Sequence, residues 1–151
     1  MLTGATVAGA GLLVSACGAV RSDETAGADD TDPTVPAVDA DSDLVETVGD
    51  QITEALALSV ATASSVRALR PLGRRLSALH RAHLRELSQP EDVEKGRVGG
   101  TAETARARLL RSEERLQQQL VRAAVAAESG ALAQVFASMA AAVAQERTVA
   151  L

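Results

Sequence analysis

The helical spacing of apolar residues, from residue 43 to the end of the chain, is the feature that most constrains the fold of this sequence. Apolar side chains recur every three or four positions, which places them along one side of an α-helix. Alternating runs rich in valine, isoleucine, threonine and aromatic residues, which are typical of strands, do not occur there. The pattern predicts an all-α domain over residues 43–151.

The first helix is expected to start at Asp43, whose carboxylate is suited to cap it. Pro71 and Gly73 interrupt the helical pattern, because the residue before a proline avoids helical geometry. They predict that the chain turns back at residues 70–73. The inner face of this helix is predicted to carry Val45, Val48, Ile52, Ala55, Leu56, Ser59, Ala63, Val66 and Leu69.

Three further helices are predicted, the second over residues 72–88. The proline, glycines and charges of residues 89–100 then predict an exposed loop. Thr101 is suited to cap the third helix, which is expected to end near Glu128, and Ser129-Gly130 provides the stop signal. The inner faces are predicted to carry Leu72, Leu76, Leu79, His80, His83, Leu84 and Leu87; Ala105, Leu109, Leu116, Leu120, Ala123 and Ala127; and Leu132, Val135, Phe136, Met139 and Val143 with Val149 or Ala150.

Four amphipathic helices joined by short turns and one longer loop predict an antiparallel four-helix bundle. Phe136 is the only aromatic residue, and alanine, which buries less apolar area than leucine, is frequent. The core is therefore expected to be thin. A homodimer through the alanine-rich fourth helix, or docking on an envelope protein partner, would compensate for this.

A short apolar segment, residues 3–14, precedes the small residues Ser15 and Ala16 and the only cysteine, Cys17. It is shorter than the roughly 20 apolar residues that span a membrane. The run Leu12-Leu13-Val14-Ser15-Ala16-Cys17-Gly18 resembles the lipobox of bacterial lipoproteins. The resemblance implies a signal peptide over residues 1–16, cleavage before Cys17 and lipid attachment to its sulfur. It places the protein at the extracytoplasmic face of the cell membrane, lipid-anchored.

Residues 1–16 contain no lysine or arginine, whereas export signals begin with positive charge. The stretch Met1-Leu2-Thr3-Gly4-Ala5-Thr6 resembles the segment that follows the paired arginines of twin-arginine export signals. We therefore expect the true translation start to lie upstream.

Residues 17–42 are predicted to comprise the lipidated cysteine and a disordered acidic linker with almost no large apolar side chain. Residues 18–42 have a net charge of −6, which leaves the predicted bundle, residues 43–151, at +1 of the whole-chain charge of −5. A nearly neutral domain gives no indication of nucleic-acid binding. The seven acidic residues, set against Arg21, are Asp23, Glu24, Asp29, Asp30, Asp32, Asp39 and Asp41.

The only two histidines, His80 and His83, lie one turn apart on the second predicted helix, with Glu86 three positions further on. Two imidazoles and a carboxylate at this spacing can share one ion. Glu113 falls in the apolar stripe of the third helix, and a buried carboxylate needs a partner. We expect it to meet a histidine of the second helix or an inward-pointing arginine. The favoured interpretation is a structural histidine–glutamate network or plain histidines at the helix interface; the alternative is a metal site that uses His80, His83 and Glu113.

The number and length of the helices resemble the ferritin-like bundles found in lipoproteins of actinobacteria. Members of the wider group that bind two irons use Glu-x-x-His motifs on two helices. Here Ser77 stands three residues before His80, and His80 three before His83, so the iron chemistry is carried over onto no position. No cofactor is expected. The sequence also lacks a glycine-rich phosphate loop and a nucleophile elbow. It therefore predicts a non-enzymatic module without catalytic residues.

Four arginines cluster around the first predicted turn, and two more lie on the second predicted helix. They are suited to bind anionic lipid headgroups or an acidic partner, although solvated charges beside helices are the default expectation. They are Arg67, Arg70, Arg74, Arg75, Arg81 and Arg85.

Overall fold

The computed structural model describes residues 40–94 and 96–150, in which the chain is helical and contains no strand. Its helices are α1 (Ala40–Ser65), the short 3-10 helix η1 (Arg67–Leu69), α2 (Arg70–Glu86), α3 (Ala102–Ala126) and α4 (Gly130–Ala150). The prediction of an all-α domain with four α-helices is confirmed for this part of the chain. The predicted signal segment, Cys17 and the linker up to residue 39 lie outside the described residues.

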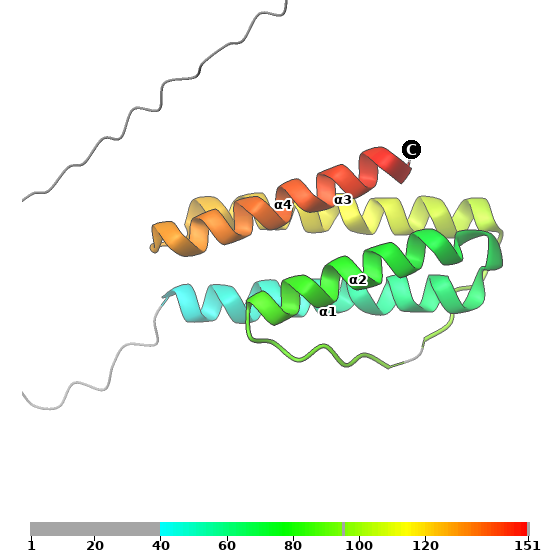
Figure 1. The fold of residues 1–151 in the computed structure, drawn as a ribbon, viewed down its shortest axis with the longest axis horizontal. Helices are drawn as coiled ribbons and strands as arrows, with labels where there is room; N and C mark the ends of the chain where they lie inside the picture. The colour runs from blue at the N-terminus through cyan, green and yellow to red at the C-terminus, as the bar shows by residue number, and fades with distance from the viewer. Residues whose placement is uncertain (1–39, 95, 151) are drawn as a thin grey trace, which may run out of the picture. The chain divides into compact units, whose positions relative to one another are not determined.

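The helices lie lengthwise beside one another and pack mainly as two pairs, α1 with α2 and α3 with α4 (Figure 1). The chain reverses its direction at η1 and again between α3 and α4 (Figure 1). Contacts of α1 with α3, and weaker ones of α2 with α4, join the two pairs. The long loop between α2 and α3 runs back along the bundle, so that α3 begins beside the turn between the first two helices.

One main apolar core lies between the four helices. Phe136 is completely buried in it, and burial of each large apolar side chain contributes about 1.5–3 kcal/mol. On α4, Ala150 is buried and Val149 is exposed, which decides between the two predicted alternatives. Other completely buried members of the core are Ile52, Leu56, Leu84, Leu120 and Val143, all of them on predicted inner faces.

The start of α1 differs from the prediction. The helix begins at Ala40, and Asp43 lies in its first turn instead of capping it. Asp41, which the sequence assigned to the linker, accepts hydrogen bonds from two backbone amides of the turn between α3 and α4. Its Oδ1 lies 2.8 Å from the nitrogen of Glu128, and its Oδ2 lies 2.8 Å from that of Ser129. This carboxylate fastens the start of α1 to the second helix pair.

The turn between α1 and α2 also differs from the prediction, because it precedes Pro71. α1 ends at Ser65, Val66 is extended, and η1 completes the reversal. Pro71 lies in the first turn of α2. The N–H groups of a first turn have no partner within the helix, so the N–H that proline lacks is not needed there. The proline therefore starts the second helix and does not break the first.

The remaining helix ends agree more closely with the prediction. Thr101 caps α3, because its side-chain oxygen accepts a hydrogen bond from the amide of Thr104 at 3.1 Å. α3 ends at Ala126, slightly before the predicted Glu128. The loop before α3 is mostly exposed, as expected, but its Val98 is buried in a small second cluster with Ala61, Leu69 and Ala105.

Gly73 allows α1 and α2 to approach closely. A Cβ atom at this position would lie 2.8 Å from the carbonyl oxygen of Ser59 and 2.9 Å from the backbone nitrogen of Ala63. These are backbone atoms of α1, so the clash is relieved only if the two helices move apart. Gly73 is consequently buried in the interface, although its sequence context predicted a turn.

Replacement of Gly73 by alanine is expected to lower the free energy of unfolding by about 1–2 kcal/mol, because overpacking outweighs the better helix propensity of alanine. The measurement is urea unfolding followed by circular dichroism. Gly130→Ala is the matched control, since a Cβ there meets nothing within 4 Å, and it should leave stability unchanged or slightly higher. Equal stability of the two variants would contradict the close approach.

Candidate functional site

Several polar side chains are buried inside the bundle, where apolar side chains are the rule. They are Ser59, Thr62, Ser77, His80, His83, Ser112 and Glu113. The two histidines and the glutamate were predicted to lie on inner faces, and so was Ser59. Thr62, Ser77 and Ser112 were not singled out, because small hydroxyl residues fit either side of an amphipathic helix.

The central contact of this buried cluster joins α2 to α3. His80 Nε2 lies 3.0 Å from Glu113 Oε1, and both side chains have an exposed fraction of 0%. An imidazole N–H donating to a carboxylate makes a charge-assisted hydrogen bond, which is stronger than a neutral one. The prediction that Glu113 meets a histidine of the second helix is therefore confirmed.

His83 lies one turn further along α2, beside His80. The two ring centroids are 6.2 Å apart, and the rings meet edge to face at 61°. Burial lowers the pKa of His83 from its usual 6.5 to about 4, and repulsion from His80 adds to this shift. His83 is consequently held in its neutral form at physiological pH.

Several buried polar atoms of this cluster have no hydrogen-bond partner among the described protein atoms. They are Ser59 Oγ, Thr62 Oγ1, His80 Nδ1, His83 Nδ1 and Glu113 Oε2. Each buried polar atom without a partner is unfavourable by about 1–3 kcal/mol. The cluster therefore retains hydrogen-bonding atoms that the described protein atoms do not pair.

The ligand set considered from the sequence is not assembled. Glu86 is exposed at the end of α2, whereas His80 and His83 are buried. Within residues 40–94 and 96–150, no group of three or more histidine, cysteine, aspartate or glutamate side chains is placed to hold a metal ion. The arrangement that the structure does provide is a histidine–glutamate pair with a second histidine beside it.

We expect the pair to stabilise the bundle cooperatively, because it joins α2 to α3 across the interior. His80→Leu or Glu113→Leu alone leaves the other partner buried without its hydrogen bond and should lower the free energy of unfolding by about 2–4 kcal/mol. The double variant should be more stable than the sum of the two losses implies, by about 1–3 kcal/mol. Urea unfolding of the four proteins measures this coupling, and strictly additive losses would show that the two side chains do not interact.

The low pKa of His83 predicts a loss of stability in acid. The unfolded chain protonates this residue near pH 6.5, and the folded chain does so only near pH 4. Neutral His83 therefore contributes fully to stability above pH 6.5. As the pH falls toward 4 this contribution is lost, and the free energy of unfolding decreases by up to about 3 kcal/mol. Unfolding free energies between pH 7 and 4 test this. His83→Gln should show a smaller slope, and an unchanged slope would contradict the assignment to His83.

A groove lies on the outer side of the α1–α2 pair. Its lining comes from Val60, Ala63 and Ser64 of α1 and from Arg70, Arg74, Ser77, Ala78 and Arg81 of α2, and its volume is about 620 Å³. The α2 residues recur at three- and four-residue spacing, so they share one side of that helix. Small side chains form the floor, and three arginines stand along it.

The six arginines that the sequence singled out have different surroundings. Arg75 forms an ion pair with Glu146 of α4 at 3.2 Å, and Arg85 forms one with Glu91 of the loop at 2.8 Å. Arg67 lies exposed in η1. The remaining three line the groove, and no carboxylate of the described residues forms an ion pair with them. The sequence indicated the cluster but not this division, which depends on the rotation of α2.

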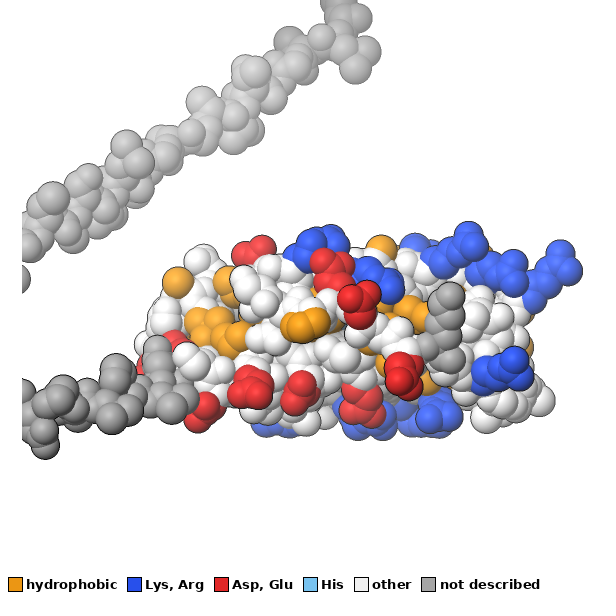
Figure 2. Space-filling model, turned by 90° about the horizontal axis from the view of Figure 1, so that it is seen from below, with side chains coloured by type: hydrophobic (Ala, Val, Ile, Leu, Met, Phe, Trp, Pro, Cys, Tyr) orange, Lys and Arg blue, Asp and Glu red, His pale blue; other side chains and the backbone are white. Residues whose placement is uncertain are grey.

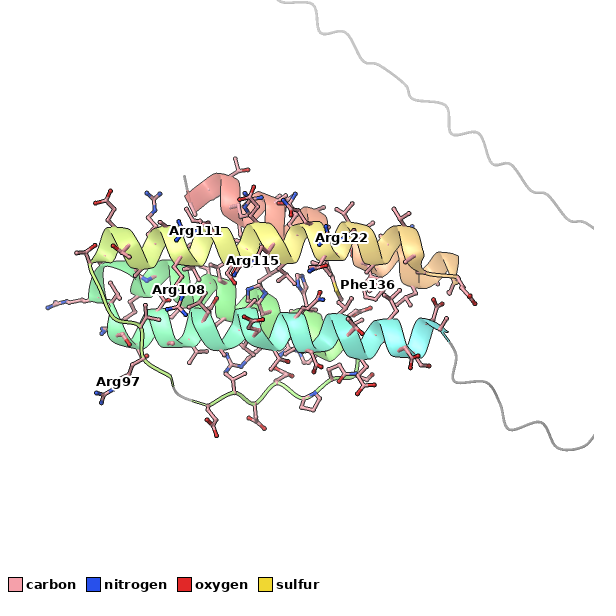
Figure 3. The ribbon with its side chains drawn as sticks, turned by 180° about the vertical axis from the view of Figure 1, so that it is seen from behind. Arg97, Arg108, Arg111, Arg115, Arg122 and Phe136 are labelled. Carbon is pink, nitrogen blue, oxygen red and sulfur yellow. The ribbon has the colours of Figure 1, made fainter. Side chains whose placement is uncertain are left out.

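Charge is also distributed unevenly along the bundle. Figure 2 shows basic side chains at the end distant from the start of α1, and acidic side chains nearer to that start. The first half of α1 carries Asp41, Asp43, Glu46 and Asp50. Arg111, Arg115 and Arg122 are spaced along α3, which lies beside α1 in the view from behind (Figure 3). The arginines of the groove are therefore not the only basic side chains, but they are the ones gathered in a concave surface.

Comparison with known proteins found no matching family, no similar curated protein and no similar solved structure. None of the described helices is both long and apolar enough to cross a membrane.

Proposed function

We propose that this chain is an exported lipoprotein, held by lipid on Cys17 at the extracytoplasmic face of the cell membrane. Its folded part is an antiparallel four-helix bundle of ferritin-like layout that works as a non-enzymatic binding module. The lipobox-like run before Cys17 supports the anchor, and the paired packing of α1 with α2 and of α3 with α4 supports the bundle.

The observation that carries the binding role is the groove between α1 and α2. It is the place where several charged side chains without a carboxylate partner gather beside accessible apolar surface. His80 and Glu113 are side chains of the types that act in acid–base catalysis, but they are completely buried and hydrogen-bonded to each other. A buried histidine–glutamate pair supports a structural role for these residues.

The alternative is a metal-binding ferritin-like bundle that uses His80, His83 and Glu113. One observation favours it: His80 Nδ1, His83 Nδ1 and Glu113 Oε2 are buried ligand-type atoms without a protein partner. They are not grouped closely enough to hold an ion in the described structure. Metal that purifies with the protein and is lost in a His80→Ala, His83→Ala variant would favour this alternative over the binding module.

The proposed partners are the membrane, through the lipid, and a second copy of the chain or an envelope protein. The fourth helix remains the proposed surface for a homodimer. Its exposed Val149 and the exposed Val121 and Val125 of α3 provide apolar surface for such contacts. Nucleic acid is not among the proposed partners.

Cys17→Ser should release the protein from the membrane fraction of cells, because the acyl chains provide most of the membrane affinity of a lipoprotein. The measurement is fractionation followed by a wash in high salt, which removes electrostatic contacts and leaves acyl chains inserted. Ser22→Ala, which lies outside the lipobox-like run, is the control and should stay with the membrane. A Cys17→Ser protein that resists the high-salt wash would overturn the proposed anchor.

A further inference from the structure

We propose that the groove lined by Arg70, Arg74 and Arg81 binds the headgroups of anionic phospholipids at the surface of a bilayer. This inference deepens the proposed function, on which it rests, because a lipid-anchored chain stays within reach of such a surface.

The chemistry of the groove suits a phosphate ester of a lipid. A guanidinium group presents a planar set of donors that fits phosphate oxygens and is weakly hydrated, so it leaves water readily. Arg70, Arg74 and Arg81 stand along one side of α2 over a distance of about three helical turns, which is roughly 16 Å. Such a row can meet more than one headgroup at once.

The floor of the groove provides a second point of fit. Val60, Ala63 and Ala78 present apolar surface between the arginines. Arginine side chains can lie along apolar surface with the charged end in the polar headgroup layer. A small inorganic anion would use only the guanidinium groups, whereas a headgroup at a bilayer surface can use the arginines and the apolar floor together.

The charges around the groove favour an anionic occupant. No aspartate or glutamate lines the groove. Among the described polar contacts, the three arginines make only one, in which Nε of Arg70 donates to the backbone oxygen of Ala63 at 3.5 Å. Ion pairs engage the neighbouring Arg75 and Arg85, which separates them from the free row. An anionic surface would therefore be attracted to the row without competition from a carboxylate of the groove.

The length of chain outside the described residues permits this contact. From Cys17 to Ala40 the backbone spans at most about 75 Å when straight. α1, with 26 residues, is about 39 Å long, so the groove near its end lies closer to Ala40 than that span. A lipid on Cys17 and the groove can consequently engage the same bilayer.

The test uses the full chain with Cys17→Ser, so that acyl chains do not contribute to binding. Its affinity is measured by co-sedimentation with vesicles of phosphatidylcholine containing 30% phosphatidylglycerol, and with vesicles of phosphatidylcholine alone. We expect binding to the anionic vesicles only, and weaker binding as salt is raised. Replacing Arg70, Arg74 and Arg81 by glutamine should weaken it on the order of 100-fold, because each basic residue near an anionic surface contributes a factor of about five.

The matched control removes the same charge from another place. Arg111, Arg115 and Arg122 are exposed along α3, away from the groove (Figure 3), and their replacement by glutamine gives a protein of equal net charge. It should keep its affinity within about fivefold. Circular dichroism verifies the fold of both triple variants. If the groove variant does not fold, Arg74→Gln, which changes one exposed side chain, should still weaken binding about fivefold compared with Arg111→Gln.

Two results would overturn the proposal: absence of binding to anionic vesicles, or equal losses in the groove and α3 variants. Binding of polyglutamate in place of vesicles, lost only in the groove variant, would also overturn it and assign the groove to an acidic protein. These results are independent of the proposed anchor, because the vesicle test omits the acyl chains. Failure of the anchor appears only in the high-salt fractionation of Cys17→Ser.

Discussion

The close packing of α2 against α1 at Gly73 is the constraint on which both polar features of the bundle depend. Only a residue without a side chain lets the backbones approach to this distance, and the approach fixes the rotation of α2. With this rotation, one side of the helix directs His80 and His83 into the core, and another side presents Arg70, Arg74 and Arg81 along the groove. A single helix thus carries both buried histidines and the three arginines of the proposed binding surface.

The interior combines a small apolar core with polar groups that do not all find partners. Leucine, isoleucine and Phe136 provide the apolar contacts, while the buried polar groups include the His80–Glu113 pair and hydroxyl groups without protein partners. Buried ionic pairs seldom add net stability compared with apolar residues of the same volume. Such a pair instead disfavours other arrangements of the helices, because a shift of α2 along its axis by one residue would leave Glu113 without its partner in the core. We infer that the pair specifies the register of these two helices.

The sequence predicted the features that depend on periodicity. The four α-helices, the inner position of most apolar residues, the Thr101 cap and the His80–Glu113 contact follow from helical spacing and from the need of a buried carboxylate for a partner. It failed where distant parts of the chain decide. Asp41 belongs to the bundle because amides far along the chain bind it, and Pro71 starts a helix because the preceding turn lies elsewhere. The groove also required the structure, because its walls come from two helices.

The position of Asp41 has a mechanical consequence. Any tension in the chain that precedes residue 40 enters the bundle at the start of α1, where the carboxylate is fastened to the turn between α3 and α4. The first residues of α1 therefore pass part of this load to the second helix pair. α1 is then not separated from its neighbours one turn at a time. A domain built in this way resists being pulled open by its own N-terminal chain.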